Sequence, residues 1–216
     1  MTRDDFETTS TDKRLRMVER QLRARDITDE RTLAAMAEVP RHRFVPAQLR
    51  KRAYRDGALR IGEGQTISQP WIVACMSQLL ELRGHETVLE VGTGSGYGAA
   101  VLSRLCERVI TIERFAGLGR QAAETLTELG YDNVEVRIGD GSLGAPDRAP
   151  FAGISITATA QNEPPPALLD QLAPGAALVC PIARGRHEQL VRVRDGKEEP
   201  VASVRFVPLV SDADDS

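Results

Sequence analysis

The residues of this chain whose types and spacing could do chemistry begin with the glycine-rich stretch "VLEVGTGSGYGAA". Gly92, Gly94 and Gly96 lack side chains, so a ligand can approach the backbone within contact distance. The helical pattern that follows would leave unpaired N–H groups at its start. Glu113 comes about 20 residues later, where a carboxylate can bridge both hydroxyls of a ribose. The spacing predicts a nucleoside-binding turn, and the simpler alternative is a tight turn without a ligand.

The glycine spacing alone leaves two classes of cofactor open. The dinucleotide pattern G-x-G-x-x-G/A fails when it is counted from Gly92, because its last position is then Tyr97. The same pattern passes when it is counted from Gly94, because its last position is then Ala99. The choice of cofactor therefore depends on the residues around the loop.

Acidic residues at the predicted strand ends favour a cationic ligand. Glu90 precedes the glycines, Glu113 ends the next strand, and Asp140 ends the third, where its carboxylate and the N–H of Gly141 could address an adenine edge. The sulfonium and α-ammonium groups of S-adenosylmethionine suit these acids better than a pyrophosphate does. A nicotinamide-dependent oxidoreductase would also need a substrate domain, which the sequence after Val134 does not offer. The loop and its acids resemble those of class I S-adenosylmethionine-dependent methyltransferases.

Composition and charge exclude several other classes of protein. A net charge of −3 and an isoelectric point near 5.7 indicate no footprint for nucleic acid or anionic lipid. No apolar run approaches the roughly 20 residues of a membrane-spanning helix, and the acidic, polar beginning is not a secretory signal. Cys75, Cys106 and Cys180 lack paired spacing and are interpreted as buried, non-catalytic thiols, and no metal-ligand spacing is present. We expect a cytoplasmic protein without a metal site.

Apolar runs that alternate with helical patterns position these residues from Thr87 onward. The alternation predicts a mostly parallel sheet covered by helices on both faces. Two alternating segments, "QLVRVRDGK" and "SVRFVPLV", flank a turn at Asp195 and Gly196 and predict an antiparallel pair at one edge. The expected strands are "TVLEVG", "RVITIE", "VEVRIGD", "FAGISITATA" and "AALVCPI", and the expected helices are "GYGAAVLSRL", "GLGRQAAETLTELG" and "PPALLDQLAPG".

Two charged helices are predicted before the sheet. Residues 13–25 carry apolar positions at helical spacing, and a second helix is expected from a Thr28 N-cap to Pro40. They would form a lid or collar. The predicted organisation is one domain, 12–210, with a helical cap (12–61), a loop and helix (62–86) and an α/β core (87–210), between disordered tails at 1–11 and 211–216.

Nearly the whole chain, from about residue 13 to 210, resembles the protein-L-isoaspartate O-methyltransferase family. The resemblance is carried by "MVERQLRARDITDERTLAAMAEVPRHRFVP", "IGEGQTISQPWIVACMSQLLEL", "VLEVGTGSGYGAAVL", "GDGSLG", "PPALLDQLAPG" and "RFVPLV". The stretch "GQTISQP" ahead of the glycine loop is specific to that family. The resemblance implies a doubly wound, Rossmann-like methyltransferase sheet with an antiparallel C-terminal edge pair and an N-terminal helical collar.

The resemblance also implies an activity and the residues that carry it. Such an enzyme methylates the α-carboxylate of isoaspartyl residues in damaged proteins, and the ester then closes to a succinimide that partly reopens to aspartate. Ser68 is the implied catalytic residue, and Ile67, Ser68, Pro208, Leu209 and Val210 are the implied peptide contacts, with Val207 in the same segment. The expected cofactor-binding residues are Gln65, Thr66, Ile67, Glu90, Gly92, Thr93, Gly94, Ser95, Gly96, Glu113, Arg114, Asp140 and Gly141.

The proposed acceptor explains why few catalytic groups are expected. A carboxylate with a reference pKa near 3.5 is already ionised at neutral pH and needs no general base. Proximity and orientation then supply most of the rate, and Ser68 would donate a hydrogen bond that aims the acceptor. A hydroxyl that caps the following helix, which Pro70 begins, is the alternative reading of Ser68.

Some positions depart from the family pattern and keep alternatives open. Ala152 stands where an aspartate is common, Arg60 where a proline is usual, and Asn162 and Glu163 lie in an altered stretch near the end of a strand. One alternative is a related O-methyltransferase that converts an aspartate of a partner peptide to an aspartimide. Another is a non-catalytic module that binds adenosyl or isoaspartyl ligands. We expect isoaspartyl proteins as partners of a monomer, and neither nucleic acid nor membrane.

Overall fold

The computed structural model describes residues 3–210 and is built on an eight-stranded sheet with the order β10-β9-β8-β6-β3-β4-β5, where β7 pairs with β8 off this path. Every pair from β8 to β5 is parallel, whereas β9 and β10 are antiparallel additions at one edge. The predicted sheet, with its antiparallel edge pair, is confirmed. The strands are β1 (Leu59–Gly62), β2 (Gln65–Ile67), β3 (Thr87–Val91), β4 (Arg108–Glu113), β5 (Val134–Ile138), β6 (Phe151–Ile156), β7 (Ala160–Gln161), β8 (Leu172–Arg184), β9 (His187–Arg194) and β10 (Lys197–Ser203).

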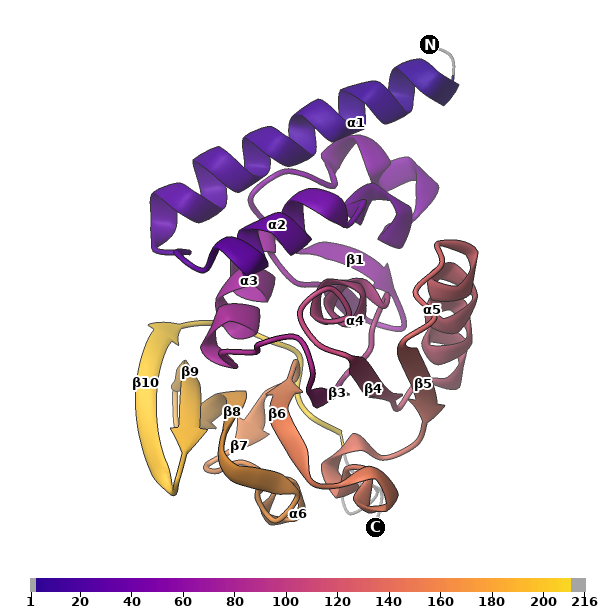
Figure 1. Ribbon diagram of the computed structural model, residues 1–216. Helices are drawn as coiled ribbons and strands as arrows, with labels where there is room; N and C mark the ends of the chain where they lie inside the picture. Colours follow the sequence, from indigo (N-terminus) through magenta and orange to yellow (C-terminus); the bar gives the residue numbers. More distant parts are fainter. Residues whose placement is uncertain (1–2, 211–216) are drawn as a thin grey trace.

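Helices cover both faces of this sheet (Figure 1). The N-terminal collar consists of α1, α2 and the short turns η1 to η4. One apolar core lies on the face of the sheet that the collar, α3, α4 and α5 cover, and a second core lies on the other face, under α6. The helices are α1 (Arg3–Met17), α2 (Glu30–Glu38), α3 (Pro70–Leu79), α4 (Tyr97–Leu102), α5 (Ala116–Glu128) and α6 (Pro166–Leu169). Short helical turns are η1 (Val18–Leu22), η2 (Arg23–Arg25), η3 (Arg41–Phe44), η4 (Ala47–Arg52), η5 (Gly141–Leu143) and η6 (Pro146–Arg148). No helix within residues 3–210 combines the length and apolarity needed to cross a bilayer.

The central strands are buried because their side chains are apolar on both faces. In β4, every residue after Arg108 is buried, which is the pattern of a strand with helices on both sides. β10, with the sequence "KEEPVAS", is mostly exposed at the edge of the sheet, where its charges discourage pairing with another chain. The turn before it has Asp195 at φ 50° and Gly196 at φ 71°, the left-handed pair that a two-residue hairpin requires.

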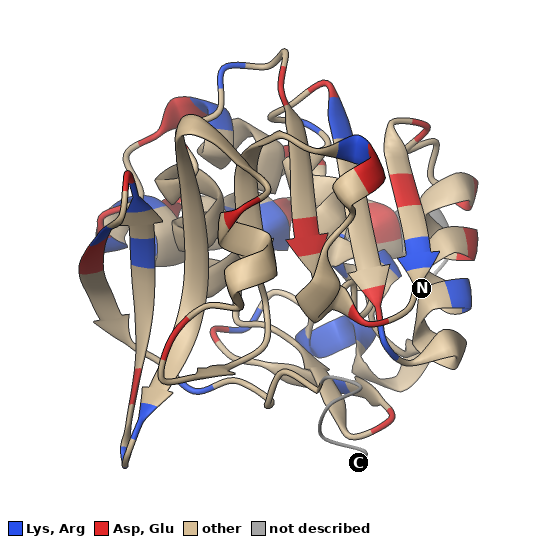
Figure 2. Cartoon of the chain, turned by 90° about the horizontal axis from the view of Figure 1, so that it is seen from below, with Lys and Arg blue, Asp and Glu red and all other residues tan. Residues whose placement is uncertain are grey.

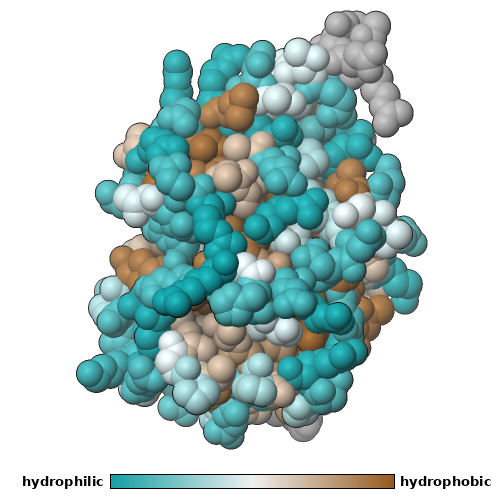
Figure 3. Space-filling view, viewed as in Figure 1, coloured by the Kyte–Doolittle hydropathy of each residue, from teal (hydrophilic) through white to brown (hydrophobic). Residues whose placement is uncertain are grey.

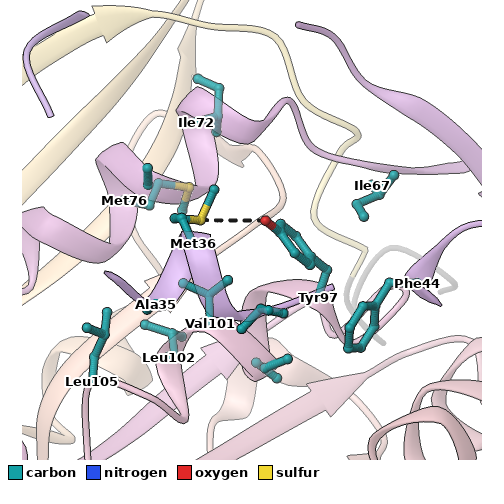
Figure 4. Packing of buried hydrophobic residues seen from close by; sticks show 14 of the residues in the cluster. Ala35, Met36, Phe44, Ile67, Ile72, Met76, Tyr97, Val101, Leu102 and Leu105 are labelled. Carbon is teal, nitrogen blue, oxygen red and sulfur yellow. Dashed lines mark hydrogen bonds between the residues drawn. The ribbon is translucent and has the colours of Figure 1, made fainter. Parts of the chain in front are cut away.

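The collar packs directly on the helix that follows the glycine loop. Met36 of α2 is fully buried, and its sulfur lies 3.6 Å from the hydroxyl of Tyr97, the first residue of α4 (Figure 4). Phe44 of η3 contacts the same tyrosine ring at a centroid distance of 5.7 Å. The collar therefore holds the start of α4, and with it the end of the glycine loop, in place.

The N-terminal region differs from the expectation in length. Residues 3–11 were expected to be disordered, but the structure continues α1 back to Arg3. Packing explains the difference, because Ser10 is buried and the ring of Phe6 contacts that of His42 edge-on at 5.6 Å. The second helix is capped by Asp29, whose carboxylate accepts from the N–H groups of Arg31 and Thr32, rather than by Thr28. The expected tail at 211–216 lies outside the described residues.

Three elements near the C-terminal half also differ from the expectation. The expected helix "PPALLDQLAPG" is only α6, because Pro174 cannot continue a helix and β8 already begins at Leu172. "SVRFVPLV" is not the second hairpin strand, since β10 precedes it and residues 204–210 leave the sheet edge. β1 pairs with β2 across the expected boundary between residues 61 and 62, so the collar and the segment after it share a hairpin.

Candidate active site

The glycine loop and four neighbouring segments line one pocket at the carboxyl ends of β3, β4 and β6. The pocket encloses about 820 Å³ of empty space including its open mouth, a size that suits a small-molecule ligand. Its lining includes twelve of the predicted site residues around the loop and hairpin: Gln65, Thr66, Ile67, Ser68, Glu90, Gly92, Thr93, Gly94, Ser95, Glu113, Arg114 and Gly141. Acidic residues lie on several strands and at their ends (Figure 2). The structure thus brings together residues from 65 to 141 of the sequence.

One glycine of the loop and one in the helix after it occupy positions where a Cβ atom would collide with another residue. Gly92 has φ 96°, and a Cβ there would collide with Oγ1 of Thr157 from the end of β6. That hydroxyl donates to the carbonyl of Gly92 at 2.6 Å, so it cannot move away freely. Gly98, inside α4, lies against Glu90, and a Cβ there would collide with its carboxylate. Close packing of strand, loop and helix therefore shapes this end of the pocket.

Glu113 holds the loop from the end of β4. Its carboxylate accepts from the N–H of Gly94 at 2.7 Å and from the N–H of Phe115 at 3.0 Å. The side chain is 5% exposed, yet it lines the pocket. These bonds fix a carboxylate at the strand end, where it can accept hydrogen bonds from vicinal hydroxyls of a bound ribose.

Glu90 is a second, more deeply buried carboxyl in the pocket wall. It is 1% exposed and accepts from Oγ1 of Thr111 at 2.7 Å. Burial raises the pKa of Glu90 to about 8; the hydrogen bond from Thr111 opposes this rise, and the nearby charge of Glu113 adds to it. Near pH 7 the carboxyl is therefore largely protonated in the ligand-free protein, and a cation bound beside it would favour the ionised form.

The β1–β2 hairpin carries the segment "GEGQTISQPW" to the mouth of the pocket. Its turn is left-handed at Glu63 and Gly64, and Gln65 to Ser68 then line the pocket. Gln69, not Ser68, is the N-cap of α3, with Pro70 in the first turn. Among the described residues, the hydroxyl of Ser68 has no hydrogen-bond partner, so it is available to a ligand. The helix-capping reading of Ser68 is therefore wrong.

Residues 204–210 form a strap, a non-helical segment that leaves β10 at the edge of the sheet and runs back toward the middle of the sheet (Figure 1). The N–H of Thr159 donates to the carbonyl of Val207 at 2.8 Å, and the N–H of Leu209 donates to the carbonyl of Thr159 at 2.9 Å. The carboxylate of Glu188 in β9 accepts from the N–H of Phe206 at 2.6 Å and from the hydroxyl of Thr159. The strap is thus pinned so that Val207, Pro208, Leu209 and Val210 line the same pocket as Ser68.

Two of the predicted site residues lie outside the pocket lining. Gly96 is the N-cap of α4 and packs against Leu126 of α5, so its glycine serves helix packing. Asp140 caps η5, where its Oδ1 accepts from the N–H of Ser142 at 2.8 Å and from the Ser142 hydroxyl at 2.7 Å. The departures Arg60 and Ala152 also lie outside the lining, and so do Asn162 and Glu163. Arg60 is nevertheless close to the pocket, because it pairs across the β1–β2 hairpin with Thr66 of the lining.

Sequence reasoning missed several residues that the fold brings to the pocket. Tyr97 and Gly98 come from the first turn of α4, and their position next to the loop was a signal that could have been used. Thr157 and Ala158 follow β6, and Val73 comes from α3. Glu188 does not line the pocket, but its hydrogen bonds hold the strap that does. Nothing in the alternating pattern of β9 distinguishes Glu188 from its solvated neighbours, so only the folded contact identifies it.

The acidic and apolar groups of the pocket fit a nucleoside that carries a positive charge. Glu113 offers two fixed acceptor oxygens, Glu90 offers a carboxyl that ionises more readily beside a cation, and Ile112, Phe115 and Val91 add apolar walls. A pyrophosphate would face the carboxyls of Glu90 and Glu113, and of the residues that line the pocket only Arg114 carries a positive charge. The geometry therefore fits an adenosyl-sulfonium cofactor better than a dinucleotide.

Comparisons with known proteins agree with this site. A family model described as protein-L-isoaspartate(D-aspartate) O-methyltransferase matches residues 12–214. The protein-L-isoaspartate O-methyltransferase of Opitutus terrae is 52% identical over 209 residues, covering 94% of this chain and 89% of the relative. The protein-L-isoaspartate O-methyltransferase 1 of Syntrophobacter fumaroxidans is 53% identical over 199 residues, covering 90% of this chain and 92% of the relative.

Two solved structures share the fold. A protein-L-isoaspartate O-methyltransferase superposes with a TM-score of 0.79 at 26% identity, over 92% of this chain and 65% of that one. A putative protein-L-isoaspartate O-methyltransferase from Plasmodium falciparum, in complex with S-adenosyl-L-homocysteine, gives a TM-score of 0.78 at 23% identity, over 91% of this chain and 98% of that one. With a family model and close relatives spanning nearly all of its length, the chain belongs to the protein-L-isoaspartate O-methyltransferase family.

Proposed function

We infer that this protein transfers a methyl group from S-adenosylmethionine to the α-carboxylate of L-isoaspartyl residues in damaged proteins. The resulting ester closes to a succinimide with loss of methanol, and hydrolysis returns part of it to aspartate. The observation that carries the proposal is the free hydroxyl of Ser68 at the mouth of a pocket whose other residues suit an adenosyl cofactor. Family membership over residues 12–214 supports the same substrate.

The cofactor supplies an electrophilic methyl group on a sulfonium, and the protein supplies position. Glu113 would bind the ribose hydroxyls, and Glu90 would stabilise the cationic part of the ligand. Gly92 and Gly94 let the backbone lie against it, and Gln65 to Ile67 cover it from the hairpin. Gly96 and Asp140 stay predicted cofactor residues; outside the pocket lining, Gly96 begins α4 and Asp140 caps η5, next to Gly141 of the lining.

The acceptor side of the site needs orientation more than acid–base chemistry. The isoaspartyl α-carboxylate is ionised at neutral pH, so no residue has to remove a proton. Ser68 donates a hydrogen bond to one carboxylate oxygen and leaves the other directed at the methyl group. The strap residues Val207 to Val210 hold the kinked peptide in the pocket that Ser68 also lines, and their pinning by Glu188 and Thr159 keeps the geometry constant.

The proposed substrate is tested with two peptides that differ only in one linkage. One peptide contains an isoaspartyl residue and the other an aspartyl residue, and both receive methyl-labelled S-adenosylmethionine. We expect label on the isoaspartyl peptide alone, followed by slow release of labelled methanol. Label on the aspartyl peptide alone would instead favour a dedicated aspartate methyltransferase that forms an aspartimide, and label on neither would favour a binding module.

The same assay tests Ser68. Ser68→Ala removes one hydrogen bond to a charged group, which is worth about 1.5–3 kcal/mol, so kcat should fall roughly 10- to 100-fold. The dissociation constant of S-adenosylhomocysteine, measured by calorimetry, should stay within about threefold, because Ser68 contacts the acceptor. Ser77→Ala in α3 is a control for hydroxyl loss away from the mouth. Unchanged kcat in Ser68→Ala would remove Ser68 from the mechanism.

Cofactor binding should depend on pH through Glu90. Because burial raises the pKa of this carboxyl to about 8, a cationic ligand that favours its ionised form must displace a proton at neutral pH. The affinity for S-adenosylhomocysteine, whose amino group is charged, should therefore increase from pH 6 to about pH 8 by up to roughly tenfold per pH unit. Calorimetry in buffers of different ionisation enthalpy should detect the released proton.

The variant Glu90→Gln provides the control for this pH dependence. It keeps the shape of the side chain and its partner Thr111, but it has no proton to release. We expect its affinity to be weaker at pH 8 and nearly independent of pH between 6 and 8. A wild-type affinity that is equally flat over this range would show that Glu90 does not titrate with binding.

A further inference from the structure

The N-terminal collar has a charge opposite in sign to that of the whole chain. Residues 13–60 of the collar contain 14 Lys and Arg but only 6 Asp and Glu, whereas the first part of α1 (residues 3–12) contains one basic and four acidic residues and the complete chain has a net charge of −3. Half of the 28 basic residues therefore lie in less than a quarter of the sequence. Figure 3 shows that the upper face, where α1 lies, is covered largely by hydrophilic side chains. Such concentration of one sign of charge indicates an anionic partner.

A groove in the collar gathers five of these cations. Lys13, Arg16 and Arg20 lie at helical spacing on one side of α1 and η1, and Lys51 and Arg55 lie across from them in η4 and the turn after it. The groove encloses about 730 Å³ of empty space including its open side. No carboxylate contributes to its lining, so like charges line both sides.

The five cations are available to a partner. All five are exposed, and among the described residues none of them forms an ion pair. The only hydrogen bond that one of their side chains makes there is from Nε of Arg16 to the carbonyl of Asp12, at 3.3 Å. Other collar arginines are already paired, such as Arg23 with Glu30 and Arg25 with Asp56. The groove thus contains unneutralised cations beside a region where neutralised ones are common.

The floor of the groove indicates a polypeptide. Met17 and Tyr54 provide buried apolar surface, and Gln21 donates through Nε2 to the carbonyl of Tyr54 at 3.0 Å. This bond sets the orientation of the amide and leaves Oε1 of Gln21 buried without a hydrogen-bond partner among the described atoms. Because this oxygen is buried, a partner in the groove would not contact it. The apolar atoms of Met17 and Tyr54 in the lining suit the aliphatic part of a peptide, which a phosphate group lacks.

The groove is joined by the chain to the active-site segment. Asp56 directly follows Arg55, and its carboxylate accepts from Nε2 of Gln69 at 2.5 Å. Gln69 is the residue after Ser68, and Trp71 donates to the carbonyl of Arg25 in the collar at 2.7 Å. A partner bound in the groove would therefore contact a part of the collar that is hydrogen-bonded to the residues next to Ser68.

We propose that this collar groove is a second substrate-binding site, which binds an acidic stretch of the protein whose isoaspartyl residue is being methylated. The inference rests on the proposed function and adds a preference within it. Charge complementarity to the groove raises the association rate and lowers KM for substrates that carry Asp- or Glu-rich segments near the damage. The methyl-transfer step itself is unchanged, because the groove contacts neither the cofactor nor the acceptor carboxylate.

The test compares three isoaspartyl peptides that share one core. The first has only the core, the second adds a tract of six glutamates, and the third adds six glutamines in the same place. Spacers of increasing length between the core and the tract measure the distance from the active site to the groove, since an extended residue covers about 3.3–3.6 Å. For wild type at low salt we expect KM of the glutamate peptide to be about tenfold below that of the glutamine peptide, and the difference to shrink at high salt.

Matched charge variants assign the effect to the groove. The variant Arg16→Gln, Arg20→Gln, Arg55→Gln should lose the preference for the glutamate tract and keep kcat and KM for the core peptide. The control Arg83→Gln, Arg120→Gln, Lys197→Gln makes the same change in net charge at exposed positions outside the groove, and it should keep the preference. Equal loss in both variants, or equal KM for both tagged peptides with wild type, would overturn the proposal.

A binding measurement separates this inference from the proposed function. Fluorescence anisotropy of a labelled glutamate tract without any isoaspartyl residue should show binding to wild type, and weaker binding to the groove variant. If no peptide is methylated, the proposed function fails while this measurement still decides the groove. A single-stranded oligonucleotide that displaces the tract at lower concentration than a free glutamate peptide would overturn the assignment to a polypeptide.

Discussion

The variant Glu113→Ala should bind S-adenosylhomocysteine about 10²- to 10⁴-fold more weakly than the wild type. Two hydrogen bonds to a charged acceptor are lost to the ribose, each worth about 1.5–3 kcal/mol. The substitution also removes the acceptor of the N–H groups of Gly94 and Phe115, so the loop loses the bonds that hold its shape. Isothermal titration calorimetry measures the affinity directly, and circular dichroism establishes that the variant is folded.

Controls separate cofactor binding from general damage. Glu113→Gln keeps the side-chain shape and one carbonyl acceptor, so its affinity should lie between those of Glu113→Ala and the wild type. Glu124→Ala in α5 removes an exposed glutamate outside the pocket lining and should leave affinity unchanged. The Glu113 variants should show a raised KM for the cofactor and a smaller loss of kcat at saturation, since the lost bonds exist before the reaction as well as during it. Affinity within threefold of wild type in Glu113→Ala would contradict the ribose assignment.

The variant Gly92→Ala should be less stable by about 3 kcal/mol and should lose most of its cofactor affinity. Gly92 has φ 96°, a conformation that costs an L-residue roughly 1–3 kcal/mol, and the new methyl group would collide with Oγ1 of Thr157. Relief requires the threonine to give up its hydrogen bonds to the carbonyls of Val91 and Gly92. For a chain of this size, the loss corresponds to a fall in Tm of about 6–12 °C, measured by differential scanning calorimetry.

Gly130→Ala is the matched control, because Gly130 also has a positive φ, 75°, but a Cβ there would meet no atom within 4 Å. It should lose only about 1 kcal/mol from backbone strain and retain cofactor affinity. If Gly92→Ala is no less stable than Gly130→Ala, the close approach of Thr157 to the loop has no energetic importance. Thr157→Ser in combination with Gly92→Ala should not restore stability, since the colliding hydroxyl remains.

Local patterns were sufficient for the central sheet and most of the pocket. β3 and β4 are short apolar runs that end in glycine or glutamate, and both features follow from local rules: burial on two faces, and a tight turn into a helix. The turn at Asp195 and Gly196 was predicted for the same reason, because only a few residue types accept two left-handed positions. Family resemblance, rather than spacing, indicated Ser68.

Two predicted site residues lie outside the pocket lining, because residues that are neighbours in the sequence have different neighbours in space. Gly96 belongs to the same glycine-rich stretch as Gly92 and Gly94, but its α-carbon packs against Leu126 of α5 and does not line the pocket. Asp140 ends a strand as Glu113 does, yet the turn that follows directs its carboxylate to Ser142. In each case the residue type indicated a loop or strand-end position, and only the packing around the residue decided which atoms it contacts.

The amino-acid sequence by itself determined the central strands, the glycine loop with the helix after it, and the acids near the ends of those strands. These features depend on contacts between residues close in the chain, so periodicity and residue type are enough to predict them. Only the tertiary structure decided by which contacts the strap is held at the pocket, that Glu188 pins it, and that five collar cations line one groove. These contacts join segments far apart in the chain, and they form because the packed core holds both partners at the required distance.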